Sequence, residues 1–139
     1  MRVLVTGGAG FVGTNLIKRL LRDGHNVVSI DNYSTGKREN EQEGCTYLEC
    51  GLEHMFERYE IAKFPDEFDK VLFGMYPELS EPDIIFHLAA IARIQPSFEH
   101  PVYTHHSNVT STLNLLDWAR SKKIPVVFAG SSSSNGDKF

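Results

Sequence analysis

A run of glycines follows the first apolar segment of the chain, and it restricts the fold more than any other feature. Residues 3–6 have the Val, Leu and Thr composition of a short buried strand, and the next seven positions are Gly7-Gly8-Ala9-Gly10-Phe11-Val12-Gly13. Apolar residues at helical spacing then predict a helix over residues 14–22, which Gly24 ends. A strand, a glycine turn and a helix in this order are typical of a turn that holds a dinucleotide.

Three of these glycines are predicted to have separate steric tasks. Gly7 permits a tight turn out of the strand, Gly10 lets a pyrophosphate approach the backbone, and Gly13 lets the helix pack closely on the sheet. The first helical turn, at Phe11 and Val12, offers unpaired N–H groups and a partial positive charge to the phosphates. The alternative is a strand-to-helix turn of the same shape that binds nothing.

The rest of the sequence continues the alternation of strands and helices. Short apolar runs predict strands over residues 27–30, 46–48, 84–88 and 126–129. Because these runs lack polar alternation, we expect both faces of a parallel sheet to be buried. The predicted fold is an α/β, Rossmann-type doubly wound sheet with strand order 3-2-1-4-5.

The helices between the later strands are predicted with less detail. A helix over residues 108–121 is expected to bury a face made of Val109, Leu113, Leu116 and Ala119. Residues 68–75 are spaced for another helix, with Pro65 near its start, and residues 55–63 are a candidate for a short extra helix.

Asp31 ends the second predicted strand, where an acidic side chain is expected to meet the ribose of an adenosine. A carboxylate accepts hydrogen bonds from both ribose hydroxyls and repels a 2′-phosphate, so the sequence favours NAD over NADP. Lys37 and Arg38 follow closely and are expected to weaken that repulsion. The alternative is that Asp31 only shapes the turn that it begins with Asn32.

Composition argues against several other partners. The net charge is −4, and no basic stripe is present that would bind nucleic acid or an anionic membrane. No apolar run approaches the roughly 18 residues that a membrane span needs, and the N-terminus does not resemble a secretion signal, which predicts the cytoplasm. Cys45 and Cys50, like the histidines at 100, 105 and 106, match no metal-ligand spacing, so no metal site is predicted. His87 is predicted to be a hydrogen-bonded core histidine.

Several short motifs together resemble one known family. They are the spacing of Gly7, Gly10 and Gly13, the pair Asp31-Asn32, the run from His87 to Ala90, Asn108, and the serines before Gly136. In this order they resemble the NAD-dependent epimerase/dehydratase family of extended short-chain dehydrogenase/reductases. The resemblance covers nearly the whole chain but only the N-terminal part of a typical member. It implies an incomplete NAD-binding domain over residues 1–139, without the last strands or the substrate domain.

The resemblance also implies roles for individual residues. The glycine turn would hold the pyrophosphate, Asp31 and Asn32 the adenosine ribose, and Leu88, Ala89 and Ala90 would lie along the cofactor near the nicotinamide ribose. Asn108 would support the neighbouring strands from its helix. Ser131, or else Ser132, would supply the catalytic hydroxyl. Gly51 stands where the family usually has an aspartate that contacts adenine, and Asn135 replaces a usual tyrosine.

The catalytic base of the family is a tyrosine followed four positions later by a lysine, on the helix after the serine strand. The two such pairs here, Tyr33 with Lys37 and Tyr59 with Lys63, both precede that strand. The resemblance therefore implies a chain that binds NAD but does not itself turn over the nucleotide sugar of a complete enzyme. A non-enzymatic dinucleotide-binding module and one half of a split enzyme are the alternatives. The bare edge of the fifth strand predicts a homodimer or a partner chain.

Overall fold

A parallel sheet runs through the middle of the protein. The computed structural model describes residues 1–55, 65–79 and 81–131. Within them five strands pair in the order β3-β2-β1-β4-β5, and every pairing is parallel. The strands are β1 (Arg2–Thr6), β2 (Asn26–Asp31), β3 (Cys45–Glu49), β4 (Ile84–His87) and β5 (Val126–Phe128). The predicted fold class and strand order are confirmed.

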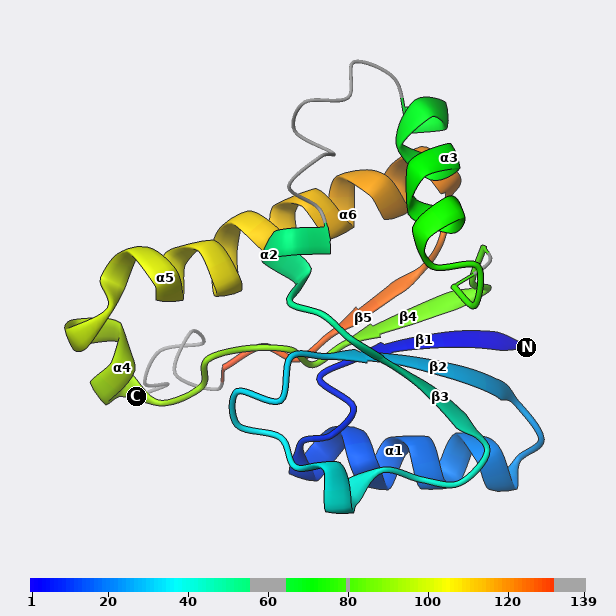
Figure 1. The fold of residues 1–139 in the computed structure, drawn as a ribbon, viewed down its shortest axis with the longest axis horizontal. Helices are drawn as coiled ribbons and strands as arrows, with labels where there is room; N and C mark the ends of the chain where they lie inside the picture. The colour runs from blue at the N-terminus through cyan, green and yellow to red at the C-terminus, as the bar shows by residue number, and fades with distance from the viewer. Residues whose placement is uncertain (56–64, 80, 132–139) are drawn as a thin grey trace, which may run out of the picture.

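Helices cover both faces of this sheet (Figure 1). On one face lies α1 (Phe11–Arg22), with the short 3-10 turn η1 (Arg38–Asn40) nearby. On the other lie α2 (Leu52–Met55), α3 (Pro65–Met75) and α6 (Ser111–Lys122). The chain enters α6 through α4 (Ile94–Glu99), α5 (Pro101–His105) and a π-helical turn, η2 (His106–Thr110). The predicted helix over residues 68–75 is confirmed, with Pro65 as its first residue.

Each face of the sheet has its own apolar core. Val3 and Val5 of β1 pack with Ile17 of α1 on one side. Leu4, between them in the sequence, points to the other side and packs in the cluster of Leu115 and Trp118. This alternation explains why β1 is apolar at consecutive positions, since both of its faces are buried. The two cysteines follow the same rule, because Cys45 packs on the α1 side and Cys50 on the α6 side.

The predicted buried face of the last helix is wrong at three of its four positions. Val109, Leu113 and Leu116 are exposed by 51%, 64% and 41%. Only Ala119 is buried, together with Ser111, Leu115 and Trp118. Two stripes of this helix have apolar residues at helical spacing, so periodicity alone does not choose between them. The buried stripe is the one that carries the large indole of Trp118.

One further expectation concerns a short helix between β3 and β4, and others concern membrane crossing and metal binding. Residues 56–63 of the expected short helix lie outside the described residues, and only Met55 of that helix is placed, in α2. In the parts of the chain that the structure describes, no helix has both the length and the apolar character for crossing a bilayer. In the same parts, no group of three or more His, Cys, Asp or Glu side chains is placed to hold a metal ion.

A buried polar cluster joins α3 to α6 and gives the first testable prediction. Asp69 accepts a hydrogen bond of 2.9 Å from the indole nitrogen of Trp118 and forms an ion pair with Lys122. In Asp69→Ala the indole N–H and the ammonium group lose this shared partner. We expect the free energy of unfolding, measured by urea titration, to fall by about 2–4 kcal/mol.

The matched control for this variant is Asp117→Ala in α6. Asp117 pairs with Arg120 at the surface, where ion pairs contribute about 1 kcal/mol or less. Equal losses of stability in the two variants would show that the Asp69 cluster is not a structural link.

Candidate functional site

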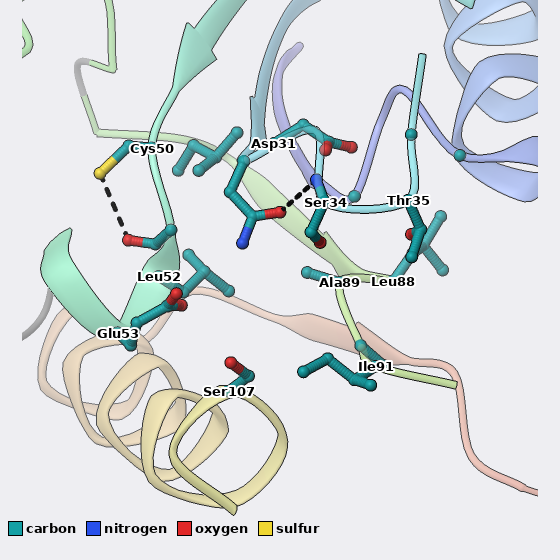
Figure 2. A pocket seen from close by; sticks show the side chains of 17 residues that line it. Asp31, Ser34, Thr35, Cys50, Leu52, Glu53, Leu88, Ala89, Ile91 and Ser107 are labelled. Atoms are coloured by element: carbon teal, nitrogen blue, oxygen red, sulfur yellow. Dashed lines mark hydrogen bonds between the residues drawn. The ribbon is translucent and has the colours of Figure 1, made fainter. Parts of the chain in front are cut away.

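A pocket opens at the carboxyl ends of the first four strands (Figure 2). Five short segments of the chain supply its lining residues. They are Gly7 and Gly10 after β1, Ile30–Asn32 and Ser34–Gly36 at the end of β2, Cys50–Glu53 after β3, Leu88–Ile91 after β4, and Ser107 in η2. Open α/β sheets bind ligands at this edge, beside the point where the strand order reverses. That point lies between β1 and β4 here.

The glycine turn has the steric properties that its sequence predicts. Gly7 has a φ of +74°, and a Cβ there would lie only 2.8 Å from the backbone nitrogen of Ala89. A Cβ on Gly13 would clash with the carbonyl oxygen of Gly7 and would lie 2.6 Å from the Cα of Gly8. Gly10 differs, because its Cβ would meet only the Gly7 oxygen, at 3.3 Å. Gly7 and Gly13 therefore shape the turn, while Gly10 leaves open space at the pocket.

The N-terminus of α1 begins at this open space. Gly10 is its N-cap, no side chain caps it, and its first turn contains no acidic residue. The side chains of Phe11 and Val12 point into solvent and do not line the pocket. What these two residues bring to the site is their backbone N–H groups, which carry the partial positive charge of a helix N-terminus. Such an end is suited to a phosphate group.

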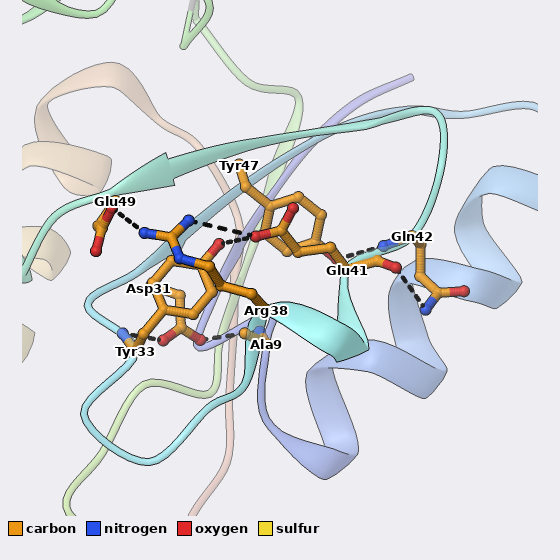
Figure 3. A network of polar contacts seen from close by, with 8 residues as sticks. All are labelled: Ala9, Asp31, Tyr33, Arg38, Glu41, Gln42, Tyr47 and Glu49. Carbon is orange, nitrogen blue, oxygen red and sulfur yellow. Dashed lines mark hydrogen bonds and ion pairs between the residues drawn. The ribbon is translucent and has the colours of Figure 1, made fainter.

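Asp31 connects the glycine turn to the end of β2. Its side chain is buried, with one carboxylate oxygen accepting from the backbone N–H of Ala9 at 2.9 Å and the other from that of Tyr33 at 2.8 Å (Figure 3). These two hydrogen bonds show that Asp31 shapes the turn that follows β2. Asp31 also lines the pocket, and each carboxylate oxygen has a second lone pair that can accept from a ligand. Asn32 lines the pocket too and accepts from the N–H of Ser34 at 3.0 Å.

The two cations that follow Asp31 are both paired with carboxylates. The guanidinium of Arg38 forms ion pairs with Glu49 and, at 3.8 Å, with Glu41, and it lies 4.5 Å from the ring centre of Tyr33 (Figure 3). Lys37 pairs with Glu39 at 3.1 Å. Lys37 and Arg38 are expected from the sequence to weaken the repulsion between Asp31 and a 2′-phosphate. The three glutamates paired with them offset that effect.

Tyr33 has none of the properties of a catalytic base. Its hydroxyl donates to Glu41 at 2.6 Å. Burial and the Glu41 carboxylate raise the pKa of Tyr33 above its usual value, whereas a phenol that must lose its proton needs a lowered pKa. Tyr59 and Lys63, the second such pair, lie outside the described residues.

A chain of hydrogen bonds links β1 to α6 behind the pocket. The hydroxyl of Thr6 accepts from the N–H groups of Leu88 and Ala89, at 3.2 and 3.1 Å, so its own proton must go to Nδ1 of His87, at 2.7 Å. Nε2 of His87 then donates to Thr112 at 2.8 Å. The expected core histidine is confirmed, and burial lowers the pKa of His87 to about 4.

Asn108 holds the β4 end of the pocket from behind. Thr112 donates to its backbone oxygen, and its side-chain amide makes two hydrogen bonds to the backbone of Ile91, at 2.8 and 3.0 Å. Ile91, Leu88, Ala89 and Ala90 line the pocket, but Asn108 does not. Asn108 thus lies where it can position the wall that a cofactor would touch.

The remaining predicted residues lie at or beyond the edge of the described part. Ser131 is exposed and follows the carboxyl end of β5, outside the pocket lining. Ser132 and Asn135 lie outside the described residues. The sequence-based prediction missed nine lining residues, namely Ile30, Ser34, Thr35, Gly36, Cys50, Leu52, Glu53, Ile91 and Ser107. The buried hydroxyl of Ser107 has no hydrogen-bond partner within the described part of the chain, so a polar ligand in the pocket would give it one.

The neutral state of His87 makes the fold sensitive to pH, which gives the second prediction. The pKa of His87 is about 4 when folded against 6.5 as an ordinary histidine. Its contribution to stability is therefore fully present above pH 6.5 and is lost as the pH falls toward 4, because between these two values the unfolded chain takes up the proton more readily than the folded one. In His87→Gln we expect a smaller loss of unfolding free energy over this range, measured by urea titration at several pH values. The exposed His100→Gln is the control, and identical pH profiles for His87→Gln and the unchanged protein would contradict the prediction.

Comparisons with known proteins find a matching family model and similar sequences. The model of the NAD dependent epimerase/dehydratase family matches residues 3–138. The UDP-glucose 4-epimerase of Mycolicibacterium smegmatis is 36% identical over 135 residues, which are 97% of this chain and 40% of that protein. The UDP-glucuronic acid decarboxylase 1 of Arabidopsis thaliana is 36% identical over 139 residues, 99% of this chain and 28% of that protein.

A solved structure gives the same result. The UDP-glucose 4-epimerase of Thermus thermophilus, in complex with NAD, superimposes with a TM-score of 0.73 at 35% identity, over 94% of this chain and 38% of that one. The chain therefore spans well under half the length of the proteins that it resembles.

Proposed function

The chain belongs to the NAD dependent epimerase/dehydratase family, and on that basis we propose that it is the NAD-binding part of a nucleotide-sugar epimerase or dehydratase. One observation carries the proposal: a single pocket joins the open N-terminus of α1 to the buried carboxylate of Asp31. A group that attracts phosphate and a group that accepts from ribose hydroxyls are thus side by side, as a dinucleotide requires. The unpartnered hydroxyl of Ser107 in the same pocket fits a polar ligand as well.

The pocket residues divide along the length of the cofactor. The pyrophosphate would lie over Gly7 and Gly10, with the adenosine ribose at Asp31 on the β2 side. The nicotinamide half would then extend across β4, along the segment from Leu88 to Ile91 that Asn108 holds. When bound there, NAD supplies a reversible acceptor for the hydride of a sugar carbon. Ser131, which follows β5, is the residue that we propose to hydrogen-bond the reacting sugar oxygen in the complete enzyme.

The substrate proposal comes from the names of the relatives. One is a UDP-glucose 4-epimerase and another a UDP-glucuronic acid decarboxylase, so a nucleotide sugar is the substrate class that we propose for the complete enzyme. The 139 residues on their own are proposed to bind NAD without turnover, because Tyr33 has a raised pKa and donates to Glu41. Epimerase and dehydratase chemistry use the same cofactor site, so this part of the chain fits both.

The test of the proposal uses the contrast between two glycines. A methyl group on Gly10 would meet only the Gly7 oxygen, at 3.3 Å, yet it would occupy the space proposed for the pyrophosphate. We expect calorimetry to show NAD binding to the unchanged chain, and Gly10→Ala to weaken it at least about tenfold, equivalent to about 1.4 kcal/mol, with little change in Tm. Gly74→Ala in α3, where a methyl group meets nothing within 4 Å, is the control and should bind normally.

Two outcomes would count against this proposal. Flat calorimetry of the unchanged chain at millimolar NAD would overturn NAD binding. Turnover of UDP-sugars by the purified 139-residue chain would overturn the expected lack of activity.

The paired state of Arg38 gives a prediction about cofactor choice. Glu41 and Glu49 both pair with this guanidinium, and Asp31 adds a further carboxylate to the pocket, so a 2′-phosphate would meet more negative than positive charge. In Glu41→Gln/Glu49→Gln, Arg38 keeps its charge and loses both ion-pair partners, and an available arginine near the ribose accommodates a 2′-phosphate. We expect the ratio of the dissociation constants of NADP and NAD, measured in parallel titrations, to fall by about tenfold. This corresponds to roughly 1.4 kcal/mol, because the 2′-phosphate loses a repulsion or gains a pairing with Arg38. Glu43→Gln, at an exposed position, is the control, and an unchanged preference in the double variant would contradict the prediction.

A further inference from the structure

We propose that the carboxylate of Glu53 selects adenine at the base-binding end of the pocket by accepting a hydrogen bond from the exocyclic amine. The inference rests on the proposed NAD site and adds a residue that determines which dinucleotide the site accepts. It is carried by the contact between Glu53 and Gly51 and by the position of both residues along the carboxyl edge of the sheet.

The strand order decides which end of the pocket receives the base. The glycine turn follows β1 and Asp31 ends β2, and β3 is the next strand outward in the order β3-β2-β1. With the pyrophosphate at α1 and the ribose at Asp31, the base must continue in the same direction, over the residues that follow β3. These are Cys50, Gly51, Leu52 and Glu53, which line the pocket. Figure 2 shows Leu52 and Glu53 on the side opposite Leu88 and Ala89.

Glu53 lies where a side chain on Gly51 would be. A Cβ built on Gly51 would lie 2.6 Å from Cδ of Glu53 and 2.8 Å from Oε2, and closer still to Oε1. Gly51 itself has no positive φ, so its backbone does not require glycine. Its carbonyl accepts from the N–H groups of His54 and Met55, at 3.1 and 3.0 Å, which fixes its place at the start of α2. The absence of a side chain at position 51 therefore makes room for the Glu53 carboxylate at the pocket wall.

The chemistry of this wall distinguishes one purine from another. Leu52 is apolar, the thiol of Cys50 donates to the carbonyl of Gly51 at 3.3 Å, and no hydrogen bond or ion pair holds the Glu53 carboxylate within the described parts of the chain. Adenine presents an amine that donates to a carboxylate. Hypoxanthine presents a carbonyl oxygen at the same position, which a carboxylate repels. An analogue without this donor leaves the carboxylate without a hydrogen-bond partner, which weakens the binding of that analogue.

The experiment compares NAD with its deaminated analogue, nicotinamide hypoxanthine dinucleotide, by calorimetry on the full chain. The unchanged protein should bind NAD about tenfold more tightly than the analogue, which is the lower range for one hydrogen bond to a charged group. In Glu53→Ala the preference should fall to about one, mainly through weaker binding of NAD. Glu43→Ala, at an exposed position outside the pocket lining, should keep the preference.

A second variant separates recognition from a purely structural role of Glu53 in α2. In Gly51→Asp/Glu53→Ala the new side chain enters the space that Glu53 vacates, and its carboxylate again faces the pocket. We expect this double variant to regain most of the preference for NAD. If Glu53 only supports the start of α2, Glu53→Ala should lower Tm and leave the preference unchanged.

The outcomes separate this inference from the proposed function. Equal binding of both dinucleotides by the unchanged chain, or an undiminished preference in Glu53→Ala, would overturn the role of Glu53 and leave the NAD site standing. A lack of binding by either dinucleotide would overturn the proposed NAD site, and the role of Glu53 with it.

Discussion

The two hydrogen bonds that the Asp31 carboxylate accepts hold the site together. One comes from Ala9 in the glycine turn and the other from Tyr33 in the loop that follows β2, so a single buried side chain fixes two segments that are distant in the sequence. Hydrogen bonds to an ionised acceptor are about twice as strong as neutral ones. The carbonyl of Ala9 in turn accepts from the side-chain amide of Asn40 at 2.8 Å, which adds a second link between the two segments. The shape of the pocket on the β2 side depends on these contacts.

The opposite wall depends on a second set of buried polar contacts. Thr6, His87 and Thr112 form a directed chain that ends at Asn108, and Asn108 holds Ile91. Each donor in this chain has one acceptor, so the burial of several polar groups costs little. Asp31, Thr6 and His87 stand at the carboxyl ends of strands, and Thr112 and Asn108 complete the second wall from α6 and η2. The segments that would touch a cofactor are loops, but their positions are set by the sheet.

The strands and their order were predictable because their signals are local. Apolar runs without alternation identify buried parallel strands, and the glycine turn identifies the first crossover. The buried face of α6 was not predictable in this way, because it depends on Trp118 meeting Asp69, 49 residues away in the sequence. The pairing of Arg38 with Glu49 depends likewise on the register of β2 with β3, which places Asp31 beside Glu49. Glu53 carries no motif, and only its contact with Gly51 reveals it.

The charges around the pocket are separated by sign along the length of the proposed ligand. The positive end of the α1 dipole faces the part where a dinucleotide carries its negative phosphates. Carboxylates dominate the adenosine side, with Asp31 at the end of β2, Glu49 at the end of β3 and Glu53 in α2. A negative adenosine side excludes a further phosphate on the ribose and favours groups that donate hydrogen bonds, namely hydroxyls and an amine. With NAD bound as proposed, the local field of the site would favour one type of dinucleotide and one orientation of it.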